Sequence, residues 1–148
     1  MADHKASALI PLVDVLGGEN VVGKARSTDV LEAKIKRGLP FRALERLMQS
    51  ARLSREQAMR LFGVPPRTLA RRKQAGTLTF EETDRLVQFA DLFAFAVRVL
   101  GTKEGAASWL QTPSPYLGGV APVERLDNVL GRNAVLEELN RIAYGMLA

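Results

Sequence analysis

Residues 108–122 read Ser-Trp-Leu-Gln-Thr-Pro-Ser-Pro-Tyr-Leu-Gly-Gly-Val-Ala-Pro. The stretch carries the only tryptophan of the chain, Trp109, and it lies between two segments whose apolar residues recur at helical spacing. Three prolines fix φ and interrupt helices here, namely Pro113, Pro115 and Pro122. The pair Gly118-Gly119 permits positive φ or a close approach of the backbone. This pattern predicts a loop of fixed geometry between two helices, which could be a structural connector or a surface for a partner.

Outward from this loop, almost every apolar segment repeats at helical spacing, and no segment shows the alternation typical of strands. Capping boxes at Ser54–Gln57 and Thr79–Glu82 predict two helix starts. The second opens the longest expected helix, which runs to Leu100 and ends at Gly101. The chain is therefore predicted to be all-α.

Further helix boundaries are predicted nearer the two ends of the chain. Residues 1–8 are expected to be a frayed start, and Thr28 is expected to cap a helix over Asp29–Arg37. After the loop, a helix is expected from Pro122 to about Leu130, broken by Gly131. The last helix is then expected to start at Asn133.

Residues 53–76 have the proportions of a helix-turn-helix. A capped first helix is followed by a turn at Gly63, Val64 fills the gap between helices, and Leu69 anchors the second helix. The remaining faces of that second helix carry side chains suited to phosphates and base edges. These candidate DNA-binding residues are Arg67, Thr68, Arg71, Arg72 and Gln74. A solvated basic face, or a docking surface for protein, is the alternative interpretation.

The charge of the chain is unevenly distributed. The net charge is +5, yet residues 1–78 hold fifteen Lys and Arg against seven Asp and Glu, and residues 79–148 hold six against nine. A basic first half suits an anionic partner such as nucleic acid.

The sequence offers no visible apparatus for catalysis. It has no cysteine, a single histidine at His4 and no clustered carboxylates, so we expect no enzyme activity, no metal site and no cofactor. The stretch Gly18–Ala25 imitates a phosphate-binding loop, but Ala25 stands where Ser or Thr is needed to reach magnesium. No signal peptide is visible, and the longest apolar stretch, Leu86–Leu100, is interrupted by charges. We therefore expect a cytoplasmic protein that makes no contact with a membrane.

The loop and its surroundings resemble the Xre/ParS/MbcA antitoxin family, which pairs with RES-domain toxins. The resemblance rests on Trp109-Leu110, Thr112-Pro113, Leu117-Gly118-Gly119, Pro122, Leu126, Gly131, Val135 and Arg141-Ile142-Ala143-Tyr144-Gly145. Leu39-Pro40 and the helix containing Thr68-Leu69 and Arg71-Arg72 extend it to residues 28–148. One position departs from the pattern, because Ala143 stands where many members have an acidic residue.

The resemblance implies a non-enzymatic antitoxin that blocks the active site of a toxin that destroys NAD⁺, and that represses its own operon. With a boundary near Gly76–Leu78 indicated by the residues, we expect an N-terminal extension over 1–27, a helix-turn-helix DNA-binding region over 28–78 and a C-terminal helical toxin-binding domain over 79–148. The expected partners are the cognate RES-domain toxin and operator DNA, bound by a homodimer or by a higher hetero-oligomer with the toxin. The implied toxin-binding residues are Trp109, Tyr116, Arg141, Tyr144, Gly145, Met146, Leu147 and Ala148. The alternative is a helix-turn-helix transcriptional regulator without a toxin partner.

Overall fold

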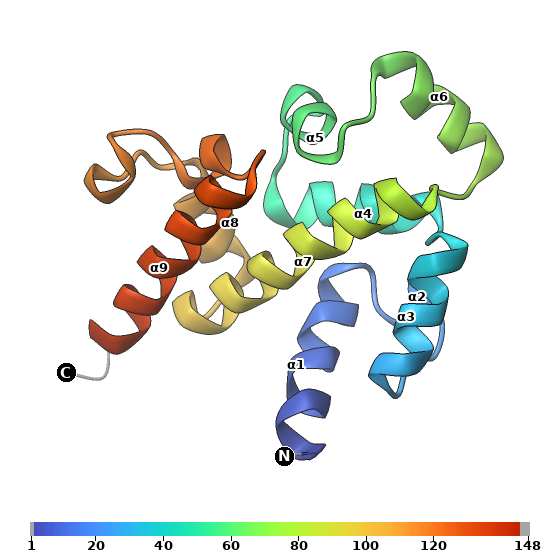
Figure 1. Ribbon diagram of the computed structural model, residues 1–148, viewed down its shortest axis with the longest axis horizontal. Coiled ribbons are helices and arrows are strands. Elements are labelled where there is room, and N and C mark those ends of the chain that lie inside the picture. Colours follow the sequence, from blue (N-terminus) through green and yellow to red (C-terminus); the bar gives the residue numbers. More distant parts are fainter. Residues whose placement is uncertain (1, 146–148) are drawn as a thin grey trace.

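The computed structural model describes residues 2–145, and the side chains of residues 9–145. Within these residues the chain forms nine α-helices, two short 3₁₀ helices and no β-strand (Figure 1). In chain order they are α1 (Ala2–Val15), α2 (Glu19–Val22), α3 (Thr28–Arg37), α4 (Phe41–Ala51), α5 (Arg55–Phe62), α6 (Pro66–Ala75), α7 (Phe80–Leu100), α8 (Lys103–Gln111), η1 (Pro115–Leu117), η2 (Pro122–Arg125) and α9 (Val129–Gly145). The predicted all-α architecture is confirmed.

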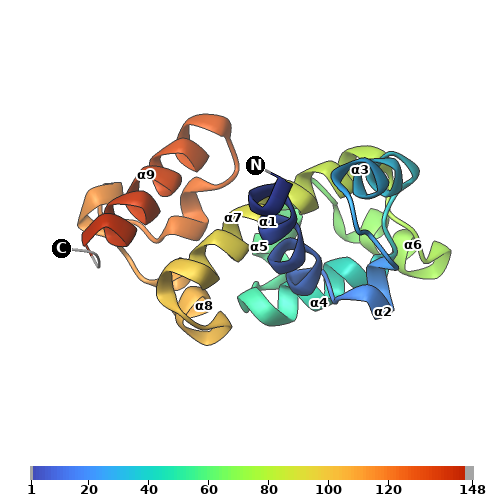
Figure 2. The ribbon, with the colours of Figure 1, turned by 90° about the horizontal axis from the view of Figure 1, so that it is seen from below.

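The long helix α7 lies at the centre of the molecule and contacts both halves of the chain. It packs against α1, α3, α4 and α5 from the first half of the chain, and against α8 and α9 from the second half (Figure 1). Seen from below, α1 lies across α7 (Figure 2). Because one helix serves both groups, residues predicted to belong to separate regions share a hydrophobic core.

The core is built from the apolar face that the spacing along α7 predicts. Leu86, Phe89 and Phe93 are buried, and the Phe89 ring meets Phe62 of α5 edge-on at 5.8 Å between ring centroids. Each such side chain contributes about 1.5–3 kcal/mol when it is removed from water. The aromatic stripe of α7 is therefore core.

Local capping signals set most helix ends, because they satisfy backbone groups left free at the termini. Both predicted capping boxes form, and Gly101 adopts the left-handed conformation at the end of α7, with φ of 94°. One cap is shifted by a residue: the Ser27 side chain accepts from the Val30 N–H, so Ser27 is the cap and Thr28 is the first residue of α3.

The prediction for the last two helices is wrong. Pro122 opens only the short helix η2, and α9 starts at Val129 and runs straight through Gly131. A Cβ at Gly131 would collide with the backbone carbonyl of Arg125. The glycine is needed for close approach of two backbone segments and does not break the helix.

The N-terminal end also differs from its prediction. Residues 1–8 were expected to be frayed, but the helix α1 begins at Ala2.

None of the helices within residues 2–145 combines the length and the apolar character needed to cross a membrane.

Candidate functional site

The helix-turn-helix is formed by α5, a tight turn and α6. Gly63 ends α5 in the left-handed conformation with φ of 66°, and its missing Cβ leaves room for the Arg85 guanidinium. Val64 is buried between the helices, and Leu69 of α6 is half-buried against the core. These three positions orient α6 as the sequence pattern predicts.

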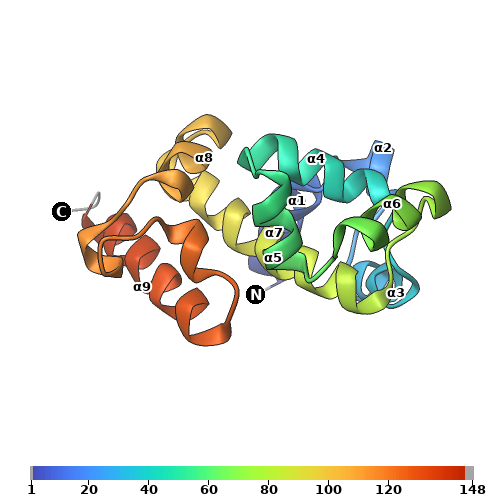
Figure 3. The ribbon, with the colours of Figure 1, turned by 90° about the horizontal axis from the view of Figure 1, so that it is seen from above.

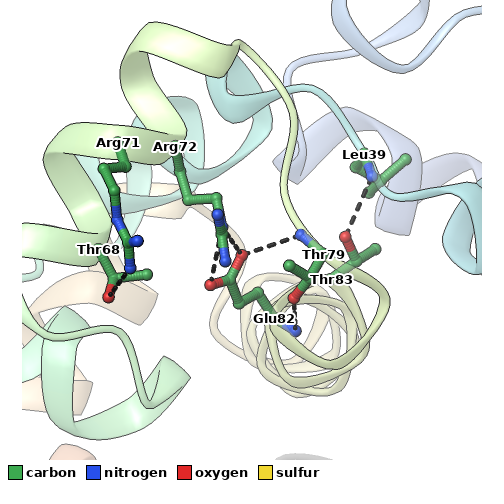
Figure 4. Close-up of polar contacts among 7 residues, drawn as sticks. All are labelled: Leu39, Thr68, Arg71, Arg72, Thr79, Glu82 and Thr83. Carbon is green, nitrogen blue, oxygen red and sulfur yellow. Dashed lines mark hydrogen bonds and ion pairs between the residues drawn. The ribbon is translucent and has the colours of Figure 1, made fainter.

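The solvent-facing side of α6 is basic. Arg67, Arg71 and Gln74 are exposed, while Thr68 is half-buried. The Arg71 Nη2 atom donates to Thr68 Oγ1 at 3.3 Å, and Figure 4 shows this pair on the far side of Arg72 from α7. Exposed guanidinium groups in this arrangement can reach phosphates or guanine edges. Lys73 is also exposed and adds a cation that the sequence analysis did not include.

Arg72 is placed differently from the other candidate DNA-binding residues. Its side chain points from α6 to the first turn of α7, where its Nε atom donates to Glu82 Oε1 at 2.8 Å and to Oε2 at 3.2 Å (Figure 4). The same Oε1 atom accepts from the Thr79 backbone N–H at 2.9 Å. Burial raises the pKa of the Glu82 carboxyl, but the contacts from Thr79 and Arg72 outweigh it and hold that pKa below its ordinary value.

The loop within residues 112–122 forms a compact turn on the C-terminal part. Gly118 and Gly119 both have positive φ, at 73° and 81°, and a Cβ at either would meet open space. Conformation, and not crowding, therefore selects glycine there. The Ser114 carbonyl accepts from the Gly119 N–H, and the Ser114 N–H donates to the Val120 carbonyl.

This loop is attached to α9 through a buried carboxylate. Glu138 is buried, and its Oε1 atom accepts from the Ser114 hydroxyl at 2.8 Å. Its Oε2 atom is buried with no hydrogen-bond partner among the described residues. The contact fixes η1 of the loop beside the second half of α9.

An exposed aromatic and cationic surface results at this end of α9. The Arg141 guanidinium lies 3.3 Å from the centroid of the Tyr116 ring, a cation–π contact between α9 and η1. Tyr116 and Tyr144 are 68% and 72% exposed, and Gly145 is exposed as well. The structure thus brings together four of the residues that the family resemblance implies.

The other toxin-binding residues implied by the resemblance do not lie on this exposed surface or are not described. Trp109 on α8 is half-buried against the core, and its indole N–H is buried without a partner in the described part of the chain. Met146, Leu147 and Ala148 lie outside the described residues. Within residues that the structure describes, no group of His, Cys, Asp and Glu side chains could hold a metal ion.

Comparison with known proteins separates the chain into two matched parts. Residues 30–91 match the model of the antitoxin Xre-like helix-turn-helix domain, and residues 95–145 match that of the antitoxin Xre/MbcA/ParS C-terminal toxin-binding domain. The chain belongs to the Xre/MbcA/ParS antitoxin family.

Three curated relatives of this antitoxin are each named antitoxin Xre. The protein of Photorhabdus laumondii is 28% identical over 120 residues, which cover 80% of this chain and 81% of the relative. That of Yersinia enterocolitica is 29% identical over 121 residues, or 80% and 82% of the two chains. That of Pseudomonas putida is 36% identical over 83 residues, covering 55% and 52%.

The two family matches correspond to the two candidate surfaces of the antitoxin. The helix-turn-helix match includes α6 and the first half of α7, and the toxin-binding match includes the loop and α9. Both matches enter α7, whereas the sequence analysis predicted a division at residue 78. That division stays a prediction.

Two polar contacts of the antitoxin were missed by the sequence analysis. Glu82 was interpreted only as a capping residue, and Glu138 was not singled out. Neither partner is near in sequence, because Arg72 lies on another helix and Ser114 lies 24 residues away. The one sequence signal for the Arg72–Glu82 pair is that Glu82 belongs to a capping box that directly follows a basic helix.

Proposed function

We propose that this antitoxin inhibits a cognate RES-domain toxin that degrades NAD⁺ in the cytoplasm, and that it represses its own operon. The observation that carries the proposal is that the two candidate surfaces lie at opposite ends of one molecule. The basic helix α6 is at one end and the exposed end of α9 at the other (Figures 1 and 3). Toxin and DNA can therefore be held at the same time.

In this proposal the antitoxin inhibits the toxin by occupying its substrate cleft, and it performs no chemical step itself. The proposed toxin-binding surface consists of Tyr116, Arg141, Tyr144 and Gly145, together with Trp109, Met146, Leu147 and Ala148. The exposed side chains of Tyr116 and Tyr144 present apolar area that a partner would cover. Aromatic and arginine side chains are the residues that most often dominate the energy of an interface. Placed at the mouth of an NAD⁺ cleft, this surface would keep the substrate out.

Co-expression with the product of the neighbouring gene tests the inhibitory function. We expect the toxin alone to lower cellular NAD⁺ and stop growth, and the intact antitoxin to restore both. An antitoxin lacking residues 144–148 should fail to protect, although the purified variant stays folded and binds operator DNA. Full protection by the shortened chain would show that inhibition comes from another surface, and a neighbouring gene without toxic activity would favour a plain transcriptional regulator.

Repression is proposed to use the exposed face of α6. Arg67 and Arg71 would contact phosphates or guanines, with Thr68 and Gln74 beside them. Each phosphate contact contributes to the salt dependence of binding. Two copies would be needed, since a two-fold symmetric dimer matches palindromic half-sites about one helical turn apart.

Operator binding is tested by gel shift and by light scattering. Arg67→Ala combined with Arg71→Ala should abolish the shift of operator DNA while toxin neutralisation persists. The protein or its complex with toxin should scatter as a dimer or a larger assembly. A variant that binds the operator like the parent would remove α6 from the proposal, and a monomer under all conditions would contradict the symmetric arrangement.

A further inference from the structure

The helix α6 is weakly attached to the rest of the molecule. All of its residues are described, and none of the ten is buried. At its N-terminal end Pro65 and Pro66 follow the buried Val64, and beyond its C-terminal end backbone hydrogen bonds join Gly76 to Phe41 and Leu78 to Leu39. Between these ends, Leu69 supplies a half-buried apolar contact. Rotation of α6 about its own axis is therefore opposed by few side chains.

The ion pair between Arg72 and Glu82 is the polar contact at the middle of this helix. The side chains of Arg72 and Glu82 are 26% and 11% exposed, so the pair is shielded from solvent more than ordinary surface pairs. The Glu82 carboxylate is also held independently of Arg72, because it caps α7 by accepting from the Thr79 N–H. The next residue, Thr83, is buried and accepts from the Leu39 N–H at 3.0 Å (Figure 4). The first turn of α7 is thus rigidly held, and the Arg72–Glu82 ion pair attaches α6 to it.

We infer that Arg72 is a positioning residue that sets the orientation of α6 on α7 for operator binding, acting through Glu82 and not by contact with DNA. The inference rests on the proposed DNA-binding function. If Arg72 instead turned to a phosphate, it would leave the Glu82 carboxylate nearly buried and without its cation, which is costly. Arg67 and Arg71, in contrast, lie on the exposed face of the same helix and contact no carboxylate among the side chains of residues 9–145.

The variant Glu82→Gln separates the two possible roles of Arg72 by the sign of its effect. Glutamine can take the place of glutamate at this position of a capping box, so the start of α7 is preserved while the negative charge is removed. If Arg72 contacts DNA, releasing it from Glu82 strengthens binding. If Arg72 positions α6 through Glu82, the same change weakens binding.

The experiment measures the affinity for operator DNA against salt concentration for the parent, Glu82→Gln, Arg72→Ala and the double variant. We expect each single variant to weaken binding by about fivefold or more, and the double variant to be no weaker than Arg72→Ala, because the two residues act as one unit. The slope of log affinity against log salt should stay that of the parent in all three. Arg67→Ala is the matched control from the same helix, and it should reduce that slope by about 1.

Two further readouts separate positioning from a general loss of fold. Toxin neutralisation should be unchanged in all variants, because α9 and its loop are not touched. Amide hydrogen exchange should speed up in α6 of Arg72→Ala and Glu82→Gln but not in Arg67→Ala.

Three results would overturn the inference while leaving the proposed DNA binding intact. These are tighter operator binding by Glu82→Gln, a reduced salt slope in Arg72→Ala, and unchanged exchange in α6 of both variants. A parent protein that binds no operator DNA would overturn the proposed DNA-binding function itself, and the role of Arg72 in it.

Discussion

Gly131 is the residue at which backbone packing decides the shape of the C-terminal part. In a helix interior, alanine is ordinarily more stable than glycine by about 1 kcal/mol. Here the added Cβ would meet the Arg125 carbonyl, which belongs to the backbone and cannot move aside as a flexible side chain could. We therefore expect Gly131→Ala to lower the free energy of unfolding by about 1–3 kcal/mol, the usual cost of overpacking.

Urea unfolding measures this effect, and Gly145→Ala in the same helix is its matched control. A Cβ at Gly145 would have no neighbour within 4 Å, so that variant should be as stable as the parent. Equal stability of Gly131→Ala and the parent would mean that α9 and η2 can separate without cost.

Glu82 should make stability depend on pH. Its pKa is lowered in the folded state, so its ionised form contributes stability that is fully present above the ordinary pKa of about 4.5. This contribution is lost as the pH falls through the lower pKa of the folded state. Glu82→Gln has no such carboxyl. The parent should therefore have the larger unfolding free energy at neutral pH, and its excess over Glu82→Gln should shrink below about pH 4. Thermal melts of both proteins from pH 7 to pH 3 check this, and a constant difference would contradict it.

At the scale of the elements, local signals were readable from sequence and non-local contacts were not. The capping boxes at Ser54 and Thr79 formed because a cap needs only residues three positions apart. The start of α9 was misplaced because the reason for Gly131 lies in the backbone of another segment. The exposed basic face of α6 followed from helical spacing, whereas the pairing of Arg72 with Glu82 depends on how two helices meet.

The helix α9 has exposed apolar side chains at both ends, and the proposed function assigns different roles to them. Tyr144 in its last turn is 72% exposed and Leu130 in its first turn is 75% exposed. We expect Tyr144→Ala and Tyr116→Ala each to weaken toxin binding by about 2 kcal/mol, as for aromatic anchors at the centre of an interface. Leu130→Ala is the matched control and should bind toxin like the parent.

Calorimetric titration of toxin with each variant measures these affinities. A loss in Leu130→Ala, with none in Tyr144→Ala and Tyr116→Ala, would place the toxin contact at the first turn of α9. In that case the loop and the Tyr116–Arg141 pair would be supports of the fold.

At the scale of the whole molecule, the DNA-binding and toxin-binding parts are joined by more than α7. Gln57 of α5 and Gln111 of α8 exchange two hydrogen bonds, at 2.9 and 3.0 Å between side-chain nitrogen and oxygen. Arg60 of α5 pairs with Glu124 of η2 at 2.9 Å. The helix α5, which carries α6 beyond it, is thereby attached to the toxin-binding part (Figure 3).

Because of these contacts and the shared core, the two matched domains should unfold as one unit. Trp109 is the only tryptophan and lies on α8, so its fluorescence reports the toxin-binding part, while far-UV circular dichroism reports all helices. We expect both signals to give the same transition in urea, as a two-state protein requires. Leu86→Ala, in the half of α7 nearer the helix-turn-helix, should lower the midpoint of both signals together, with a loss of about 2–5 kcal/mol. If the circular dichroism transition moved while the Trp109 transition stayed, the domains would be independent, and toxin binding at α9 could not alter α6 through the core.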